Sequence, residues 1–438
     1  MGEGERAAAH DAMSRSRAVR TASGLSLGLA GLVILAPAAA GLVRLSPSVT
    51  GFVKPRAAVI TVPSSINHSC KVNVAAALNS FLASVPADST VEMPSGACYR
   101  ASTSVDVAGL VGVTLDGGGA VIRQPSYVKD HFRPVLTLDN DSDVTITDLT
   151  VKGPSSVGTE YTEGDYGIYM SDDSDVTLSS VTVDDVKGDG IILSPADDHR
   201  LNEDITVTGS TIEKVGYHGV TIQAVSGVTF SKDNFTEIGV DAVDMEVDQA
   251  TTVFVDGEPT WWAEDGVRFE DDTFSHILRG NWIASLQGQE VQEDDLQLID
   301  NTLATPGPGL SVQIVGNPEE PNDGLVIEGN VVEGTQWSSG SVVDSPGAAV
   351  IGLTYVDDVT ISGNTATFFD GTPTDYPNTP WIPAVAIHGV AGCEVDSNSF
   401  PGALVPLQVD PPSWPARTPW AGTPSSDESQ SGNTYGPT

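Results

Sequence analysis

Val144-Thr-Ile-Thr-Asp-Leu-Thr-Val151 is followed 32 residues later by Val176-Thr-Leu-Ser-Ser-Val-Thr-Val183, and the two segments share one pattern. An apolar residue, any residue and a second apolar residue are followed by four residues and then, in most copies, by a third apolar residue. The pattern occurs ten times, beginning at Val113, Val144, Val176, Ile205, Val228, Val267, Leu296, Leu325, Val359 and Cys393. Successive starts are separated by 23 residues (205 to 228) to 39 residues (228 to 267). A period of two inside a long repeat predicts strands in stacked coils.

A second short apolar segment follows the pattern in most copies. These segments are Gly167–Met170, Gly190–Leu193, Gly219–Ile222, Ala242–Met245, Gly309–Val312 and Ala384–Ile387. Two or three strands per repeat, without a helical pattern between them, predict an all-β solenoid: a parallel sheet wound into about ten turns. Strands stacked about 4.8 Å apart would make it about 50 Å long. Alternating small sandwiches would not reproduce one position-specific pattern at this period.

The first 45 residues have the composition of a targeting segment. Basic residues between Arg15 and Arg20 precede an uncharged stretch from Leu25 to Val43, which contains the small residues Pro37 to Ala40. This order predicts an export signal. An uncleaved membrane anchor is the alternative, because a stretch of this length can span a bilayer. In either case we expect the rest of the chain to be secreted or held at the cell surface.

The segments that flank the repeats predict a linker, a cap and a tail. We expect a linker over residues 46–67, an N-terminal cap over 68–110, the solenoid over 111–410 and a tail over 411–438. The cap contains apolar residues at helical spacing, namely Val74, Leu78, Phe81, Leu82 and Val85. A capping helix there would cover the unpaired strands of the first turn. The tail is rich in Pro, Ser, Thr and Gly and has too few apolar residues to pack.

Two of the three cysteines bracket the cap. We expect Cys70 and Cys98 to form a disulfide in an oxidising compartment, and two buried thiols are the alternative. Cys393 occupies an apolar position of the tenth repeat. A buried free thiol is expected there.

The charge balance excludes some partners. Asp and Glu number 59 and Lys and Arg number 20, so the formal net charge is −39. Such a surface repels phosphate backbones and anionic membranes. We therefore expect no nucleic-acid partner and no membrane contact except through an N-terminal anchor. We also expect a monomer.

The order of a helix followed by a solenoid, the Val-Thr-Ile-x-x-Asn strings and the strand starts Asp189-Gly-Ile191 and His218-Gly-Val220 resemble the right-handed parallel β-helix, or pectate-lyase-like, superfamily. The resemblance covers residues 68–410. It implies the fold, but it leaves the function open, because that superfamily holds lyases, glycoside hydrolases, epimerases, phage tailspikes and adhesins.

One polar position recurs two residues before the closing apolar residue of the repeat. Asn301, Asn330, Asn364 and Asn398 share it, and Ser210, Asp233 and Asp272 occupy it in earlier copies. Stacked side chains at this position would hydrogen-bond along the solenoid axis. We expect this column to be structural.

A second polar position lies just before the second strand. Aligned on the start of that strand, successive repeats place Tyr166, Asp189, His218, Asp241 and Arg279 there. Neighbours in this file would lie about 5 Å apart, a separation at which carboxyls and a base can share protons with one substrate oxygen. Taken singly, an Asp before Gly also fits a turn former, and His218 fits a wall residue without a function.

Polar and aromatic residues are expected around this file. The outward face of the following strand would supply Thr221, Gln223, Asp244, Glu246 and, as an aromatic platform, Trp282. A loop from Val247 to Gly266 contains the pair Trp261-Trp262. These rings could stack on sugars, or they could instead cover the wall of the solenoid.

The file is also similar to that of polygalacturonase-type glycoside hydrolases, which place acids and a histidine before Gly at this position. The matching strings are Lys187-Gly-Asp189-Gly190, Tyr217-His218-Gly219, Asp241-Ala242 and Arg279-Gly280, although the order differs and the Asp-Asp doublet and the Arg-Ile-Lys string are absent. In a hydrolase, one of Asp189, Asp241 and Asp244 would protonate the glycosidic oxygen, another would activate water, and His218 would orient them or share a proton. In a β-eliminating lyase, Ca²⁺ held by Asp241, Asp244 and Glu246 would neutralise a uronate carboxylate, with Arg279 as base or clamp.

The sequence thus predicts an exported protein that cleaves polysaccharide, as a hydrolase or a lyase, in a groove on the solenoid wall. A non-catalytic glycan-binding or adhesin-like surface protein is the alternative. The negative charge favours a neutral or mixed glycan over a polyanionic one unless metal ions intervene. Apart from Ca²⁺ in the lyase case, no cofactor is expected.

Overall fold

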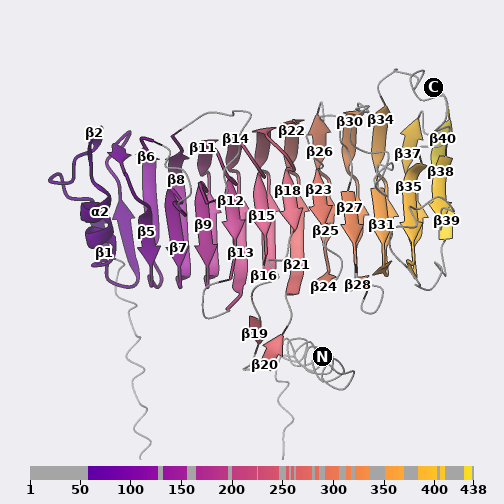
Figure 1. Ribbon diagram of the computed structural model, residues 1–438, viewed down its shortest axis with the longest axis horizontal. Helices are drawn as coiled ribbons and strands as arrows, with labels where there is room; N and C mark the ends of the chain where they lie inside the picture. The colour runs from indigo at the N-terminus through magenta and orange to yellow at the C-terminus, as the bar shows by residue number, and fades with distance from the viewer. Residues whose placement is uncertain are drawn as a thin grey trace, which may run out of the picture.

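The computed structural model describes residues 58–126, 132–154, 164–195, 200–223, 225–245, 253–255, 258–260, 263–278, 282–285, 292–304, 312–316, 321–335, 351–368, 383–401, 405–409 and 429–436. These residues form one long coil of parallel strands, which runs from β1 and the helix α2 at one end to β39 and β40 at the other (Figure 1). Within these ranges, no helix combines the length and the apolar character needed to cross a bilayer. The predicted targeting segment, residues 1–45, lies outside them.

The ten copies of the pattern lie in one ladder of the larger sheet, to which β3 and β39 add one strand at each end. Its strands are β3 (Ser89–Glu92), β6 (Thr114–Arg123), β8 (Ser142–Lys152), β10 (Ser174–Ser179), β13 (Asn202–Thr208), β16 (Val225–Ser231), β21 (Ala263–Glu270), β25 (Gln297–Ile299), β29 (Val326–Glu328), β33 (Thr360–Ser362), β36 (Glu394–Asp396) and β39 (Ser429–Ser431). Each strand pairs in parallel with the next, and Val144 lies opposite Val176. The predicted alignment of the repeat is therefore the register of the sheet.

A second ladder of the same sheet carries the closing apolar residues. It contains β4 (Cys98–Arg100), the ends of β6 and β8, β11 (Thr182–Val186), β14 (Thr211–Val215), β17 (Asn234–Ile238), β22 (Thr273–Ile277), β26 (Thr302–Ala304), β30 (Val331–Thr335), β34 (Thr365–Phe368), β37 (Ser399–Pro401) and β40 (Thr434–Gly436). The same sheet also contains β1 (Ala58–Thr61), β2 (Ser69–Asn73), β24 (Gln292–Asp294), β28 (Asn322–Asp323) and β32 (Val356–Asp357). β19 (Val253–Val255) and β20 (Glu258–Thr260) pair as a separate antiparallel hairpin.

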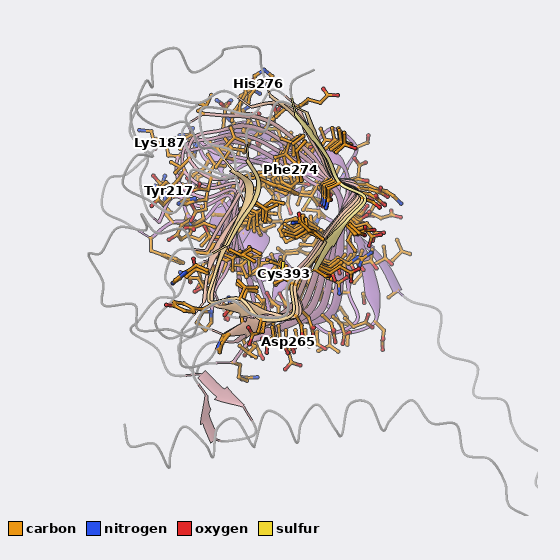
Figure 2. All side chains as sticks on the ribbon, turned by 90° about the vertical axis from the view of Figure 1, so that its right-hand side faces the viewer. Lys187, Tyr217, Asp265, Phe274, His276 and Cys393 are labelled. Carbon is orange, nitrogen blue, oxygen red and sulfur yellow. A yellow bond between two sulfur atoms is a disulfide. The ribbon has the colours of Figure 1, made fainter. Side chains whose placement is uncertain are left out.

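The predicted second strands form a sheet of their own. It consists of β5 (Val105–Ala108), β7 (Leu136–Asp139), β9 (Ile168–Ser171), β12 (Ile191–Leu193), β15 (Val220–Ile222), β18 (Val243–Met245), β23 (Ile283–Ser285), β27 (Val312–Val315), β31 (Ile351–Thr354), β35 (Pro383–His388) and β38 (Val405–Val409). Apolar residues of both sheets fill the coil, where Phe274 points inward (Figure 2). Identical residues of neighbouring turns stack in the core: the ring centroids of Phe230 and Phe269 lie 4.7 Å apart, and the rings are nearly parallel.

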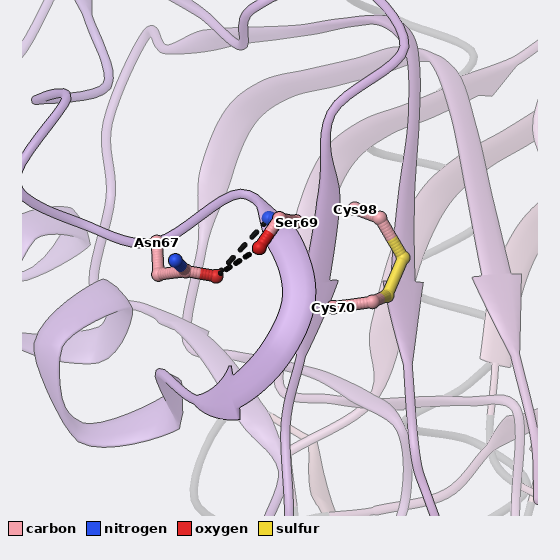
Figure 3. Close-up of a disulfide and its surroundings, with 4 residues drawn as sticks. All are labelled: Asn67, Ser69, Cys70 and Cys98. Carbon is pink, nitrogen blue, oxygen red and sulfur yellow. Dashed lines mark hydrogen bonds between the residues drawn. A yellow bond between two sulfur atoms is a disulfide. The ribbon is translucent and has the colours of Figure 1, made fainter.

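The predicted helix and both cysteine predictions are confirmed. α2 (Ala75–Leu82) buries Leu78 and Leu82 against the first turns. Cys70 and Cys98 form a disulfide that joins β2 to β4 (Figure 3). Cys393 is free and buried.

The ends of the solenoid extend beyond the predicted boundaries. Residues 58–61, predicted as linker, form β1 and pair with β3, and Val62 joins the core. Residues 429–436, predicted as loose tail, form β39 and β40 on β36 and β37. Asn433 explains the second difference, because its Oδ1 accepts hydrogen bonds from the backbone N and the Nδ2 of Asn398.

The predicted amide column is confirmed. The backbone N of each member donates to the side-chain oxygen of the next from Ser210 through Asp233, Asp272, Asn301, Asn330 and Asn364 to Asn398. A second, unpredicted column links Leu110 to Asp141, Asp141 to Asp173 and Asp173 to Asn202 in the same way. Both columns are buried and hold neighbouring turns in register.

Candidate active site

The predicted column of Tyr166, Asp189, His218 and Asp241, called the file above, is positioned by the small residues that follow its members. A Cβ on Gly190 would lie 2.5 Å from the carbonyl O of Gly219 and 2.7 Å from Cγ2 of Ile212, so this inward position admits no side chain. Asp244 lies between the core residues Val243 and Met245 and therefore faces outward, and His218 lies on the same side, since its Nε2 is 3.4 Å from Oδ2 of Asp244. The backbone N of Gly190 donates to the carbonyl O of His218, and that of Gly219 donates to the carbonyl O of Asp241. Asp189, His218 and Asp241 therefore stand in adjacent turns on one wall.

His218 lies between two carboxylates of the next turn. Its Nδ1 is 3.5 Å from Oδ2 of Asp241, and its Nε2 is 3.4 Å from Oδ2 of Asp244. The preceding turn contributes Asp189, whose Oδ1 accepts a hydrogen bond of 3.2 Å from the backbone N of His218. Three carboxylates and one imidazole thus converge, and we call Asp189, His218, Asp241 and Asp244 the acid–histidine cluster.

The cluster is largely enclosed. Asp189 and His218 are each 4% exposed and Asp241 is 8% exposed. Burial lowers the pKa of His218 to about 4, although two carboxylates beside an imidazole would by themselves favour its charged form. Burial is the larger effect, so the imidazole is neutral at pH 7 and carries a proton on one nitrogen only. Neither ring nitrogen has a hydrogen-bond partner in the described part of the chain.

Three of the predicted binding residues lie near the cluster. Tyr166 occupies the file one turn before Asp189, since Ile168 pairs with Ile191, and it is half-buried. Thr221 lies opposite Asp244 on the adjacent strand. Thr221 is fully buried and Gln223 is 9% exposed. The expected open polar floor is therefore a covered one.

Trp282 is not a binding platform, which corrects the prediction. Val243 pairs with Ile283 and Asp244 with Ala284. The outward position of this turn, which the prediction gave to Trp282, is therefore occupied by Ala284. This register gives Trp282 the inward place of Ala242. Trp282 is 3% exposed, and its ring lies 5.4 Å from that of Phe274 in the core.

The same register changes the alignment of Arg279. The prediction matched Arg279 with Asp241, an offset of 38 residues (279 − 241), whereas the strands pair at an offset of 40 (283 − 243). The alignment that placed Arg279 in the file is therefore not the one that the strands adopt. Arg279 itself, Glu246, Trp261 and Trp262 lie outside the described residues.

An aromatic group beside the file was missed. Tyr166 and Tyr169 are stacked with ring centroids 6.2 Å apart, and Phe132 meets Tyr169 edge-on at 4.9 Å. Phe132 is 62% exposed. Tyr169 could have been found from the sequence, because it precedes Thr221 and Asp244 on the outward row of the same sheet.

The cluster also contains the donors of a metal site. One ligand atom each from His218, Asp241 and Asp244 lie within 4.8 Å of one another. The predicted Ca²⁺ set of Asp241, Asp244 and Glu246 had only oxygen ligands. An imidazole nitrogen at the centre instead suits Zn²⁺ or Mn²⁺ better than Ca²⁺.

A coil of parallel strands with this register defines the class to which the chain belongs. Residues 134–400 match the family described as "Right handed beta helix region", so the protein is a member of that family. No curated protein matches the chain.

Solved structures with a similar fold differ widely in what their names describe. The catalytic unit of the GH87 alpha-1,3-glucanase of Streptomyces thermodiastaticus is 16% identical, with 86% of this chain and 68% of that chain covered and a TM-score of 0.49. The Dettilon tailspike protein is 11% identical, with 86% and 68% covered and a TM-score of 0.50. PfbA, a surface adhesin of Streptococcus pneumoniae, is 10% identical, with 86% and 92% covered and a TM-score of 0.46. At these identities the similarity concerns the fold alone.

Proposed function

We propose that this protein is an exported enzyme that cleaves a neutral polysaccharide, with the acid–histidine cluster as its active site. The observation that carries the proposal is the position of His218, which lies within 3.5 Å of two carboxylates from one neighbouring turn and is bonded through its backbone to a third. A neutral substrate suits a chain with a net charge of −39, because uronate polymers would be repelled.

The arrangement supports general acid–base hydrolysis by Asp241 and Asp244. One carboxyl protonates the glycosidic oxygen as its bond to the anomeric carbon breaks. The other, as carboxylate, takes a proton from the water that adds to that carbon. At the end of the reaction the acid has lost a proton and the base has gained one.

His218 is positioned to reset this pair. Its two nitrogens face different carboxylates, so the imidazole can accept a proton at one nitrogen and release one from the other. The proton taken from water then returns to the acid without leaving the cluster. In this scheme Asp189 is a positioning residue that acts through the backbone of His218.

The enclosure of the cluster favours a second candidate function. With Asp189 and His218 only 4% exposed, a glycan must displace whatever covers them before it can react. A non-catalytic glycan-binding or surface protein needs no such opening. In that case the acid–histidine cluster would be a buried polar network that stabilises the wall of the solenoid.

Activity measurements separate the two candidates. The protein is incubated with neutral and acidic glycans, with and without Ca²⁺, and new reducing ends and unsaturated-uronate absorbance are followed. We expect reducing ends from a neutral glycan and no absorbance. Asp241→Asn, Asp244→Asn and His218→Asn should each lower the rate about 100-fold or more.

The control for these variants is Asp143→Asn, which alters an exposed carboxylate of β8. It should keep the full rate, and all variants should unfold at a similar temperature. Glycan binding without cleavage would support the non-catalytic candidate. Unsaturated products would replace hydrolysis by elimination.

A further inference from the structure

Two atoms of the acid–histidine cluster, Nε2 of His218 and Oδ2 of Asp244, are also suitable metal ligands. Nε2 of His218 points at Oδ2 of Asp244, and neither nitrogen of this buried ring has a hydrogen-bond partner among the described residues. Oγ1 of Thr221, on the strand beside Asp244, is likewise buried and without a hydrogen-bond partner in that part of the chain. Unsatisfied buried donors and acceptors are costly and require an explanation, and a bound ion is one of them.

We propose that His218 and Asp244 form a binding site for a divalent transition metal such as Zn²⁺, and that a bound ion inhibits the enzyme. The first part depends only on the geometry of the cluster. The second part rests on the proposed function, because it concerns the proton transfer through His218.

The distances fit a zinc site. Two ligand atoms that each lie about 2.0–2.1 Å from a tetrahedral Zn²⁺ are about 3.3 Å apart. Nε2 of His218 and Oδ2 of Asp244 are 3.4 Å apart, so both can reach one ion with almost no movement. The oxygen of Asp241 lies within 4.8 Å of the other ligand atoms and can approach the same ion or serve as a partner of the ligand His.

Asp241 supplies the outer contact that metal-bound histidines usually have. Its Oδ2 lies 3.5 Å from Nδ1 of His218, on the side of the ring away from Asp244. A proton held at Nδ1 by this carboxylate leaves Nε2 as the lone-pair nitrogen that a metal needs. The net charge of −39 raises the concentration of divalent cations near the protein as a whole.

A metal at Nε2 is incompatible with the proton return. The reset of the acid and the base requires both nitrogens of His218 to exchange protons. An ion on Nε2 and on Asp244 removes one of these nitrogens and one of the two catalytic carboxylates. Zinc should therefore act as a competitive block at the active site rather than as a cofactor.

Metal binding is measured directly by titration calorimetry on protein freed of metal with a chelator. ZnCl₂ should bind at one site per chain and CaCl₂ more weakly. His218→Asn and Asp244→Asn should weaken Zn²⁺ binding about tenfold or more. The matched control is His276→Asn, which replaces an exposed imidazole of β22 (Figure 2) and should leave the affinity unchanged. Thermal unfolding without metal checks that each variant is folded.

The remaining outcomes separate this proposal from the proposed function. Equal Zn²⁺ binding by His218→Asn and wild type, or no binding by either, overturns the metal site but leaves cleavage untouched. Zn²⁺ binding by a protein that cleaves no glycan keeps the metal site and rejects the enzyme. In an active protein, added Zn²⁺ should lower the rate and chelator should restore it, and stimulation by Zn²⁺ would overturn the inhibitory role.

Discussion

At the scale of single residues, Asp272 is a carboxyl in a column position where Asn301, Asn330, Asn364 and Asn398 have an amide that donates hydrogen bonds. Its neighbour Asn301 donates from Nδ2 to the carbonyl O of Phe269 and to Oδ1 of Asn330. In the same place Asp272 has an oxygen, Oδ2, that has no hydrogen-bond partner in the described part of the chain. Burial is the main reason that the pKa of Asp272 is raised to about 8, and the charge of Asp233 adds to it.

Asp272→Asn should therefore stabilise the protein in alkaline solution. The new amide would donate where the carboxylate cannot, and no charge would be buried. We expect a gain of about 1–3 kcal/mol in the free energy of unfolding at pH 8 and a smaller change at pH 5, where Asp272 is protonated. Chemical denaturation at both pH values measures the difference.

The reciprocal substitution is the control. Asn330→Asp places a carboxyl in the next part of the column, where both amide protons of Asn330 are now bonded. It should destabilise the protein more at pH 8 than at pH 5. If both variants change stability equally at the two pH values, the column does not discriminate between amide and carboxylate.

Single residues also show where sequence reasoning fails. Asp189, His218 and Asp241 could be aligned because a small inward residue follows each of them. The next turn offers Gly280 and Trp282 as alternative starts, two residues apart, and the two starts place Trp282 on opposite sides of the wall. Only packing decides between them: the adopted register buries the indole of Trp282 against Phe274. The sequence pattern did not show that the first two positions of this strand both face inward, as Ala242 and Val243 do.

At the scale of elements, the disulfide should matter most to the cap. It joins β2 to β4 across 28 residues and thereby closes a loop that contains α2. Loop closure in the unfolded chain predicts about 3–4 kcal/mol of stabilisation for a loop of this length. Cys70→Ala combined with Cys98→Ala should lower the unfolding temperature, and reductant should have no further effect on the double variant.

Cys393→Ala is the matched control for the cap prediction. It removes the buried free thiol at the other end of the solenoid and should leave the response to reductant as in wild type. Hydrogen exchange locates the effect, because each turn of a solenoid contacts only its neighbours. Exchange in the double variant should rise in β2, α2 and β4. A uniform rise over all turns would contradict a local role.

The elements also differ in how well they could be predicted. α2 and the central strands follow from helical spacing and from the apolar repeat. β1, β39 and β40 were missed because, within the described part of the chain, each pairs with a strand on one side only, and β1 and β39 are largely exposed. Their apolar pattern is weak for that reason. The segment Asn433-Thr434-Tyr435 nevertheless has the same pattern as Asn398-Ser-Phe400: an Asn of the amide column is followed two residues later by an aromatic residue.

At the scale of the whole molecule, the repeat was sufficient to predict the solenoid but not its electrostatics. Period and alternation report which residues face the interior, and the register confirms them. The period and the alternation do not show that some Asp side chains are buried inside the solenoid. Asp141, Asp173, Asp233 and Asp272 are all at most 2% exposed. A polar residue in a repeat looks the same whether it faces water or joins a buried column.

These four buried acids give the whole molecule an unusual dependence on pH. Burial is the largest cause of a raised pKa in each, to about 6 for Asp141, about 8 for Asp173, about 7 for Asp233 and about 8 for Asp272. In the unfolded chain each should titrate near 3.8. The stability that their protonated forms contribute is thus complete below about pH 4 and is lost as the pH rises through 6 to 8.

The unfolding temperature should therefore fall between about pH 6 and pH 8, where Asp173 and Asp272 still hold their protons only in the folded chain, and it should level off above pH 8. His218 acts in the opposite direction, because burial lowers its pKa from 6.5 to about 4. Its effect is complete above about pH 6.5, so it does not oppose the fall at higher pH. Calorimetric scans at fixed ionic strength measure the slope. The double variant Asp173→Asn, Asp272→Asn, with one change in each column, should flatten it, because two of the acids that lose protons only in the alkaline range are then absent. An unfolding temperature that stays constant or rises from pH 6 to pH 8 in the wild type would show that these carboxyls are already ionised in the folded protein.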